Sequence, residues 1–270
     1  MTVRFVELGT PAEPLRIEYA WIAPQRRERP LLVFLHEGLG SLAMWRDWPA
    51  QVCAAGDFRG LVYSRPGYGQ STPRPAHERW RPDFMHVHAL DVLPRLLAAL
   101  ASESDTARPW LVGHSDGGSI ALILAARRPG AVAGVVAIAP HIFVEDVSIA
   151  SIEKAREAYR TTDLPRRLVR YHADPDSAFY GWNDVWLAPQ FRDWSIEAML
   201  SRLHCPVLAI QGVDDEYGTL AQIEGIRERA PQAELVVLDG CGHSPHRDRA
   251  DAMTQAIVGF VARHEPLTQR

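Results

Sequence analysis

Short apolar runs and longer amphipathic stretches alternate along most of the chain. The clearest run, Leu31–Leu35, lies between Pro30 and a glycine-rich turn and predicts a strand buried on both faces. Further strands of this kind are predicted at 60–63, 110–112, 132–138, 207–210 and 235–238, and helices at 84–101, 120–128, 220–229 and 250–263. Doubly buried strands separated by helices favour an α/β fold with a mostly parallel central sheet flanked by helices. The early segments 3–6 and 15–21 have short connections, so we expect them to form an antiparallel edge.

Residues 141–203 interrupt this alternation, because no run in this stretch predicts a core strand. Six aromatic residues lie within sixteen positions, where the chain average of 9% predicts one or two: Phe179, Tyr180, Trp182, Trp186, Phe191 and Trp194. We therefore expect a helical cap at 141–203, inserted into an α/β core at 1–140 and 204–270. Most of the aromatic residues should form the small core of the cap, while Trp182 and Trp186 are candidates for lining a substrate pocket.

The net charge and the cysteine content exclude several classes of protein and of binding partner. The chain has 270 residues with 29 basic and 33 acidic side chains, and its net charge of −4 gives no electrostatic case for binding nucleic acid or an anionic membrane. Its three cysteines lack metal-ligand spacing, which argues against a disulfide framework or a structural zinc. No apolar run reaches the about 20 residues that span a bilayer, and the first residues lack the apolar core of a signal peptide. We expect a reduced, cytoplasmic protein, and the oligomeric state stays open.

The strongest chemical signal lies at Gly113–Gly117, which fits the pattern G-x-S-x-G between a predicted strand and a predicted helix. In this context a tight turn holds the central serine in a strained conformation. Its hydroxyl is then exposed at the carboxyl edge of the sheet, over a helix N-terminus that favours negative charge. A phosphate-binding loop is the weaker interpretation, because neither its lysine nor G-x-G-x-x-G is present. The pattern predicts Ser115 as a nucleophile.

A serine hydroxyl needs a base to remove its proton, and a carboxylate to orient that base. His243 follows the last predicted strand on a glycine-flanked loop, and we favour it over His246 as the base. Asp215 follows Gly212 by three residues at the end of a predicted strand, which favours it as the acid. Asp214 and Glu216 remain alternatives.

A tetrahedral oxyanion requires two hydrogen-bond donors. The backbone N–H of Asp116, directly after the nucleophile, is one candidate. The glycine-rich turn at 36–41 supplies the other, for which we favour the Gly38 N–H, with Glu37 or Leu39 as alternatives.

The order Ser115, Asp215, His243, together with the early glycine-rich turn, resembles the α/β-hydrolase superfamily over about residues 31–263, including its lid-bearing esterases and carbon–carbon bond hydrolases. More narrowly, the stretch from Ser115 to Gly118 is similar to valacyclovir hydrolase (biphenyl hydrolase-like) enzymes, in which the acid after the nucleophile is implicated in holding a substrate ammonium group. The resemblance implies that Asp116 is a candidate substrate-binding residue. The chain departs from the family at Glu37, where most relatives have glycine, and in the acid loop, which lacks the usual proline. Glu37 and Tyr217 are therefore further candidates for the pocket.

Together these features predict a capped serine hydrolase of the carboxylesterase type. It would cleave a small to medium ester through an acyl-enzyme, with an amino-acid ester as one option, and would need no metal or organic cofactor. One alternative is a carbon–carbon bond hydrolase of the meta-cleavage type, whose polyanionic substrates would favour a basic pocket. Candidates for such a cluster are Arg156, Arg160, Arg166, Arg167 and Arg170. The other alternative is a ligand receptor on the same fold with little turnover.

Overall fold

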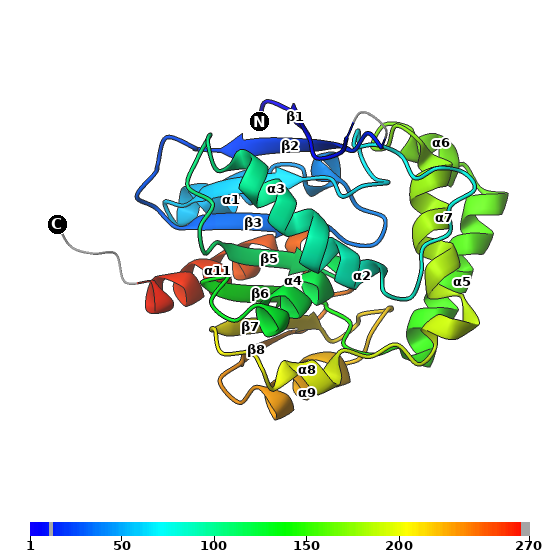
Figure 1. Ribbon diagram of the computed structural model, residues 1–270. Helices are drawn as coiled ribbons and strands as arrows, with labels where there is room; N and C mark the ends of the chain where they lie inside the picture. The colour runs from blue at the N-terminus through cyan, green and yellow to red at the C-terminus, as the bar shows by residue number, and fades with distance from the viewer. Residues whose placement is uncertain (11–12, 266–270) are drawn as a thin grey trace.

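The computed structural model describes residues 1–10 and 13–265. Positions 11–12 and 266–270, which belong to the expected core ranges 1–140 and 204–270, lie outside the described residues. Eight strands form one sheet in the order β1-β2-β4-β3-β5-β6-β7-β8 (Figure 1). Their bounds are β1 (Arg4–Glu7), β2 (Arg16–Ile22), β3 (Leu31–Leu35), β4 (Arg59–Tyr63), β5 (Trp110–His114), β6 (Gly134–Ile138), β7 (Val207–Gly212) and β8 (Glu234–Leu238).

The pairing of the strands confirms the predicted fold class. β1 and β2 form the antiparallel edge, and β2 pairs antiparallel with β4, while all the other neighbours are parallel. Along β3, Leu31, Val33 and Leu35 enter one hydrophobic cluster. Leu32 and Phe34 enter the other, on the opposite face. This alternation explains why the run is continuously apolar, since both faces of the strand are covered.

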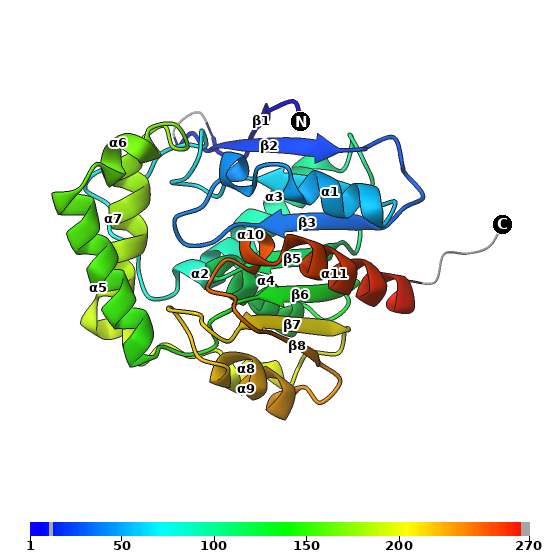
Figure 2. The same ribbon diagram turned by 180° about the vertical axis from the view of Figure 1, so that it is seen from behind.

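Helices cover both faces of the sheet (Figures 1 and 2). One face carries α1 (Trp48–Ala55), which the apolar pattern did not predict, and α11 (Ala250–His264), with the short α10 (Pro245–Asp248) beside them. The other face carries α2 (Phe84–Val87), the π-helical turn η2 (His88–Val92), α3 (Leu93–Leu100), α4 (Asp116–Arg127) and α9 (Ala221–Arg229). A short 3-10 turn, η1 (Leu42–Trp45), precedes α1. Of the described helices, none is both long enough and apolar enough to cross a membrane.

The predicted helix at 84–101 forms, but it is interrupted at its centre by η2. Pro94 lies in the first turn of α3 and has no N–H to donate to the carbonyl of Leu90 one turn earlier. Arg128 Nη2 donates to that carbonyl oxygen instead, at 2.7 Å. A side chain from the end of α4 therefore satisfies the backbone group that proline leaves free.

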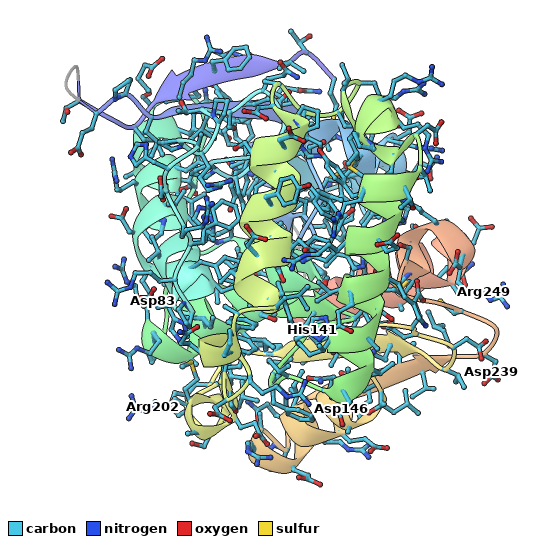
Figure 3. All side chains as sticks on the ribbon, turned by 90° about the vertical axis from the view of Figure 1, so that its right-hand side faces the viewer. Asp83, His141, Asp146, Arg202, Asp239 and Arg249 are labelled. Atoms are coloured by element: carbon cyan, nitrogen blue, oxygen red, sulfur yellow. The ribbon has the colours of Figure 1, made fainter. Side chains whose placement is uncertain are left out.

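Within residues 141–203, three helices stand beyond the carboxyl ends of the parallel strands, whereas the last one, at 197–200, lies beside α9 at the sheet (Figures 1 and 2). We call α5 (Asp146–Thr161), α6 (Leu164–Leu168) and α7 (Pro175–Trp186) the helical layer. It is followed by η3 (Pro189–Phe191) and α8 (Glu197–Leu200). Figure 3 looks onto this layer from outside, with α5 and α7 in front of the strand ends. The carboxyl edge of the sheet is therefore covered rather than open.

The start of α4 allows a direct test of the packing. A Cβ atom on Gly117 would overlap the backbone carbonyl oxygen of Leu35, which cannot move without disturbing β3. We expect Gly117→Ala to lower the free energy of unfolding by about 1–3 kcal/mol, measured by urea denaturation. Gly259→Ala, in the interior of α11 where the nearest atom is the flexible Arg263 guanidinium, should raise it by up to about 1 kcal/mol. Equal effects of the two substitutions would contradict the inferred close packing.

Candidate active site

Ser115 forms the turn between β5 and α4 by itself. Its backbone has φ +53° and ψ −120°, a conformation that costs a residue with a side chain about 1–3 kcal/mol. The Ser115 N–H donates to the carbonyl oxygen of Ile138 at the end of β6, at 2.8 Å, and this bond holds the turn against the neighbouring strand. The serine is thus held at the carboxyl edge of the sheet, where the sequence pattern places it.

His243 and Asp215 meet at the same edge from two different loops. His243 lies between β8 and α10, and Asp215 follows β7. His243 Nδ1 is 2.8 Å from Asp215 Oδ1 and 3.0 Å from Oδ2. The carboxylate also accepts hydrogen bonds from the Tyr217 N–H at 2.8 Å and from Gln211 Nε2 at 2.7 Å. Tyr217 and Gln211 therefore fix the orientation of the acid and, through it, of the imidazole.

The electrostatics of this pair favour an ionised acid. Burial alone would raise the pKa of Asp215, whose side chain is 0% exposed. The hydrogen bond and charge of His243, together with the Tyr217 N–H, outweigh that effect and lower the pKa below its ordinary value of 3.8. Asp215 is therefore negatively charged at neutral pH and can stabilise a positive charge on His243.

Ser115 and His243 line one cavity of about 290 Å³ at the covered edge of the sheet. The sheet side contributes the turn after β3 and the loops that carry Ser115, Tyr217 and His243. The helical layer contributes the opposite wall: Ile152, Ala155, Leu164, Phe179, Trp182 and Trp186. Residues separated by more than 120 positions in the sequence thus share a single small enclosure.

Gly38 lies under the indole of Trp182 in this cavity. A Cβ atom at position 38 would overlap the Trp182 ring, so glycine allows the ring to approach the backbone closely. The other predicted donor, the Asp116 N–H, belongs to the first residue of α4 and has no acceptor within its own helix. Gly38 lines the same cavity as Ser115, and Asp116 follows Ser115 directly in the chain; the role of their N–H groups as oxyanion donors stays a prediction.

The remaining predicted pocket residues divide into two groups. Glu37, Tyr217, Trp182 and Trp186 line the cavity. The Asp116 side chain is only 1% exposed, and it contacts Trp186 Nε1 at 3.2 Å and Arg65 Nη2 at 3.7 Å. Burial raises the pKa of Asp116, and Arg65 and Trp186 oppose that effect. The carboxylate is therefore directed into the protein, and a role in holding a substrate amine stays a prediction.

The alternative base and the alternative acids have surroundings that differ from those of His243 and Asp215. The ring of His246 packs against Trp45 and Trp48, and burial lowers its pKa to about 3. Asp214 is exposed. Glu216 Oε2 accepts a hydrogen bond from the backbone N–H of His243, at 3.1 Å, rather than from its ring. These contacts leave Asp215 as the carboxylate bonded to the His243 ring.

Two features of the site were not anticipated from the sequence. His141 lines the cavity, with its ring 5.9 Å from that of His243, and burial lowers its pKa to about 3. In addition, the hydroxyls of Ser148 and Ser151 on α5 donate to the carbonyls of Tyr217 and Glu216 in the acid loop. The position of His141 just after β6 was an available signal, because side chains that follow parallel strands meet at the carboxyl edge. No sequence pattern marks the two serines.

Comparison with known proteins is consistent with this architecture. Residues 32–256 match the sequence model described as the alpha/beta hydrolase family. The chain is 25% identical over 252 residues to the dihydrolipoyllysine-residue acetyltransferase component of an acetoin cleaving system from Pseudomonas putida, a match that covers 86% of this chain and 64% of that protein. It therefore spans slightly less than two thirds of that relative. It is 26% identical over 216 residues to the serine hydrolase BPHL of Homo sapiens, covering 76% of this chain and 69% of BPHL.

Solved structures share the fold over nearly the whole chain. A carboxylesterase structure from the thaumarchaeon Nitrososphaera gargenis has a TM-score of 0.75 at 21% identity, and covers 97% of this chain and 99% of that one. The meta-cleavage product hydrolase of Pseudomonas fluorescens IP01 has a TM-score of 0.72 at 18% identity, covering 97% and 98%. The predicted fold class, and the resemblance to the biphenyl hydrolase-like enzymes, are confirmed. The chain belongs to the alpha/beta hydrolase family.

Proposed function

We propose that this protein is a hydrolase, a serine esterase that cleaves a small to medium carboxylic ester through an acyl-enzyme. The observation that carries the proposal is the cavity shared by Ser115 and His243, with Asp215 bound to Nδ1 of the imidazole. Because Nδ1 is engaged by the carboxylate, Nε2 is the nitrogen left to accept the hydroxyl proton.

The proposed reaction has two halves. Ser115 Oγ attacks the ester carbonyl carbon while His243 Nε2 takes its proton, and the Asp116 and Gly38 N–H groups stabilise the oxyanion. When the intermediate collapses, the carbon–oxygen bond to the alcohol breaks and His243 returns the proton to the leaving alcohol. Water then attacks the acyl group, gives a proton to His243, and releases the carboxylic acid as Ser115 regains its hydroxyl proton.

We propose that residues 141–203 act as a cap that limits substrate size. Trp186 Nε1 donates to the Asp116 carboxylate, so α7 is tied to the residue after the nucleophile. The bonds from Ser148 and Ser151 tie α5 to the loop that carries Asp215. The cavity of about 290 Å³ and its wall of Phe179, Trp182 and Trp186 suit a compact, partly apolar acyl group.

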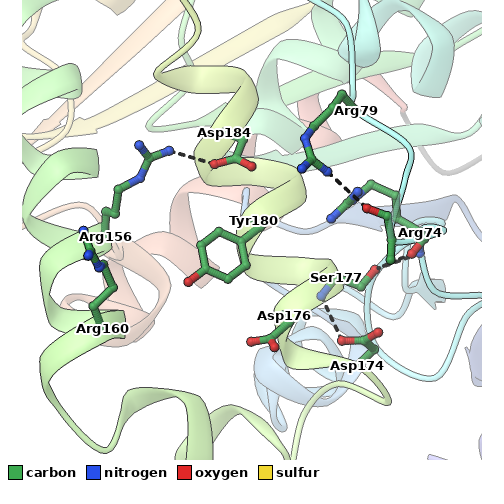
Figure 4. Close-up of a pocket in the computed structure, with 10 residues that line it drawn as sticks. Arg74, Arg79, Arg156, Arg160, Asp174, Asp176, Ser177, Tyr180 and Asp184 are labelled. Atoms are coloured by element: carbon green, nitrogen blue, oxygen red, sulfur yellow. Dashed lines mark hydrogen bonds and ion pairs between the residues drawn. The ribbon is translucent and has the colours of Figure 1, made fainter.

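The charges around the cavity favour an ester over a polyanionic carbon–carbon bond substrate. Among the described residues that line it, Glu37 and Glu216 are acidic and none is lysine or arginine. Arg156 and Arg160 instead line a separate pocket of about 550 Å³ on the other face of α7 (Figure 4). There Arg156 binds Asp184 at 2.8 Å. A substrate with several carboxylates would therefore meet negative charge in the shared cavity, which disfavours its binding.

Two other features disfavour a ligand receptor and an amino-acid ester as substrate. The hydrogen-bonded pair Asp215–His243 and the strained Ser115 are features that a ligand receptor without turnover does not need. The Asp116 side chain is buried against Arg65 and Trp186 and is not among the residues that line the shared cavity, which favours esters without a free amine over amino-acid esters.

Replacing the proposed nucleophile tests the mechanism. We expect Ser115→Ala to lower kcat for p-nitrophenyl esters by up to about 10⁶-fold, because Ser115 Oγ is the proposed acyl acceptor. A fluorophosphonate should label Ser115 in the unsubstituted enzyme, as peptide mapping would detect, and should not label the variant. The exposed Ser201→Ala is the matched control and should leave both readouts unchanged.

The same assay separates the alternatives. Sustained turnover of neutral esters, with little turnover of a carboxylate-bearing vinylogous diketone, supports the esterase. The reverse preference would favour the carbon–carbon bond hydrolase, and binding without turnover would favour the receptor. Undiminished ester turnover by pure Ser115→Ala would remove Ser115 from the mechanism.

Two neighbouring carboxylates allow a matched test of the acid. Asp215→Asn should lower kcat by about 10⁴-fold, because an amide does not hold the imidazole in the tautomer that accepts the serine proton. Asp214→Asn changes the exposed neighbour and should leave kcat within about twofold. Similar losses in both variants, measured with one p-nitrophenyl ester, would contradict the assignment of Asp215.

The lowered pKa of Asp215 also predicts a pH-dependent contribution to stability. A carboxyl group whose pKa is lower in the folded state stabilises the fold above its unfolded pKa of about 4, and this contribution is lost as the pH falls through the folded value. The difference in free energy of unfolding between the unsubstituted protein and Asp215→Asn, measured by urea denaturation, should therefore shrink below about pH 4. A constant difference from pH 7 to pH 3 would contradict a depressed pKa.

A further inference from the structure

Arg65, in the loop after β4, is a buried arginine to which the proposed mechanism assigns no task. Its side chain is 0% exposed, and the ring of Tyr68 covers the guanidinium at 4.6 Å. Nη2 donates to the backbone carbonyl oxygen of Glu37 at 2.8 Å and lies 3.7 Å from Oδ2 of Asp116. One nitrogen of this side chain therefore faces both segments that carry the proposed oxyanion donors.

The Glu37 carbonyl and the Gly38 N–H belong to one peptide group. This peptide is trans, so its C=O and N–H bonds point in opposite directions. Three donors converge on the carbonyl oxygen: Arg65 Nη2 at 2.8 Å, His36 Nδ1 at 2.7 Å and the Gly40 N–H at 3.1 Å. The Gly38 N–H has no backbone acceptor in the described part of the chain, and Gly38 lines the cavity. The donors on the carbonyl thus fix the direction of the N–H that the mechanism assigns to the oxyanion.

The neighbours of His36 fix the direction of its two hydrogen bonds. The backbone N–H of Arg65 can only donate, so Nε2 of His36, 3.0 Å away, accepts. The proton of the neutral ring is then on Nδ1, which donates to the Glu37 carbonyl oxygen. Burial and the charge of Arg65 lower the pKa of His36 well below its ordinary value, in agreement with a neutral ring. Of the two side chains that donate to this carbonyl, Arg65 is therefore the one that carries a charge.

The second proposed donor belongs to a residue that the same guanidinium contacts. Asp116 begins α4, and its carboxyl group lies between Arg65 and Trp186, which donates to Oδ1 at 3.2 Å. Arg65 itself is not among the described residues that line the cavity. Any effect of Arg65 on the reaction must therefore pass through the groups that it holds.

We propose that Arg65 is a positioning residue that sets the proposed oxyanion site. It holds the Glu37–Gly38 peptide and the Asp116 side chain, so that both N–H groups are in place before the oxyanion forms. A charged donor on the carbonyl also polarises the N–H at the other end of the same peptide, which strengthens that hydrogen bond in a buried site. The inference rests on the proposed function, because it gives Arg65 a task in the ester reaction.

Two ketones with the same acyl chain test this role. Ser115 Oγ adds to the carbonyl carbon of a trifluoromethyl ketone, the serine proton passes to His243, and the carbonyl oxygen becomes an oxyanion. The matched methyl ketone is a weaker electrophile and reports ground-state binding. In Arg65→Met we expect kcat for a p-nitrophenyl ester and the affinity for the trifluoromethyl ketone to fall at least about tenfold. KM and the affinity for the methyl ketone should change less than about twofold.

Arg59, at the amino end of β4, provides the matched control. It is also a buried arginine, with a side chain 4% exposed, and it donates to the Arg29 carbonyl oxygen at 2.9 Å and to Ser104 Oγ at 2.6 Å. Arg59→Met should lower the free energy of unfolding, as Arg65→Met does, but should leave kcat and both ketone affinities within about twofold. Arg65→Lys retains the charge without the planar fork of donors, and should recover part of the loss.

His36 allows the same carbonyl to be tested if Arg65→Met does not fold. His36→Gln places an amide near the position of Nε2, so it keeps an acceptor for the Arg65 N–H and loses the donor to the Glu37 carbonyl. His36→Asn places its amide near Nδ1 and keeps that donor. We expect His36→Gln to lower kcat and trifluoromethyl ketone affinity at least about threefold more than His36→Asn does.

The outcomes distinguish this inference from the proposed function. Unchanged kcat in folded Arg65→Met, equal losses in Arg65→Met and Arg59→Met, or equal weakening of both ketones would overturn the positioning role and leave the esterase standing. If Arg65→Met does not fold, unchanged kcat in both Arg65→Lys and His36→Gln would overturn it. If the unsubstituted protein neither hydrolyses esters nor prefers the trifluoromethyl ketone, the proposed function is wrong and the role of Arg65 is wrong with it.

Discussion

The close packing of the first turn of α4 against the end of β3 is the constraint on which the site depends. Gly117 lies against the carbonyl of Leu35, and this approach leaves a single residue to join β5 to the helix. Ser115 must therefore adopt a positive φ, and its N–H is held by β6. The cost of that conformation is offset by the surrounding packing of a doubly covered sheet. The result is a hydroxyl at the carboxyl edge, beside the loops after β3, β7 and β8.

A buried polar network extends this constraint to the helical layer. Arg65 is fully buried, contacts Asp116 at 3.7 Å and donates to the backbone carbonyl of Glu37 at 2.8 Å. Asp116 in turn accepts from Trp186 on α7. Removing one member of a buried charged pair typically costs about 3–5 kcal/mol, because the partner is left uncompensated. The network thus joins the turn after β3, the nucleophile turn and α7 into one unit, and it suits Asp116 to a supporting role.

Some elements could be predicted from the local apolar pattern, whereas others depend on contacts with distant parts of the chain. The continuous apolar run of β3 predicts a doubly covered strand, because its side chains alternate between two cores. The predicted helix at 84–101 forms with a π-helical turn, because Pro94 removes one hydrogen-bond donor. The short α1, with Pro49 in its first turn, gives no clear periodic signal. His141 and the two serines of α5 belong to the site only because distant segments fold onto the strand ends.

The fold class, the resemblance to the family, and the candidates Ser115, Asp215 and His243 could all be predicted from the residues alone, because strand-end motifs and their order depend on local backbone geometry and residue type. The amino-acid sequence did not show which side chains face the cavity, since that depends on contacts between segments more than 100 residues apart. Only the tertiary structure decided that the carboxylate of Asp116 is directed toward Arg65 while that of Glu37 lines the cavity and faces His114. The physical reason is that the direction and charge of a carboxylate are set by the partners that surround it in the fold, and those partners are not its neighbours in the chain.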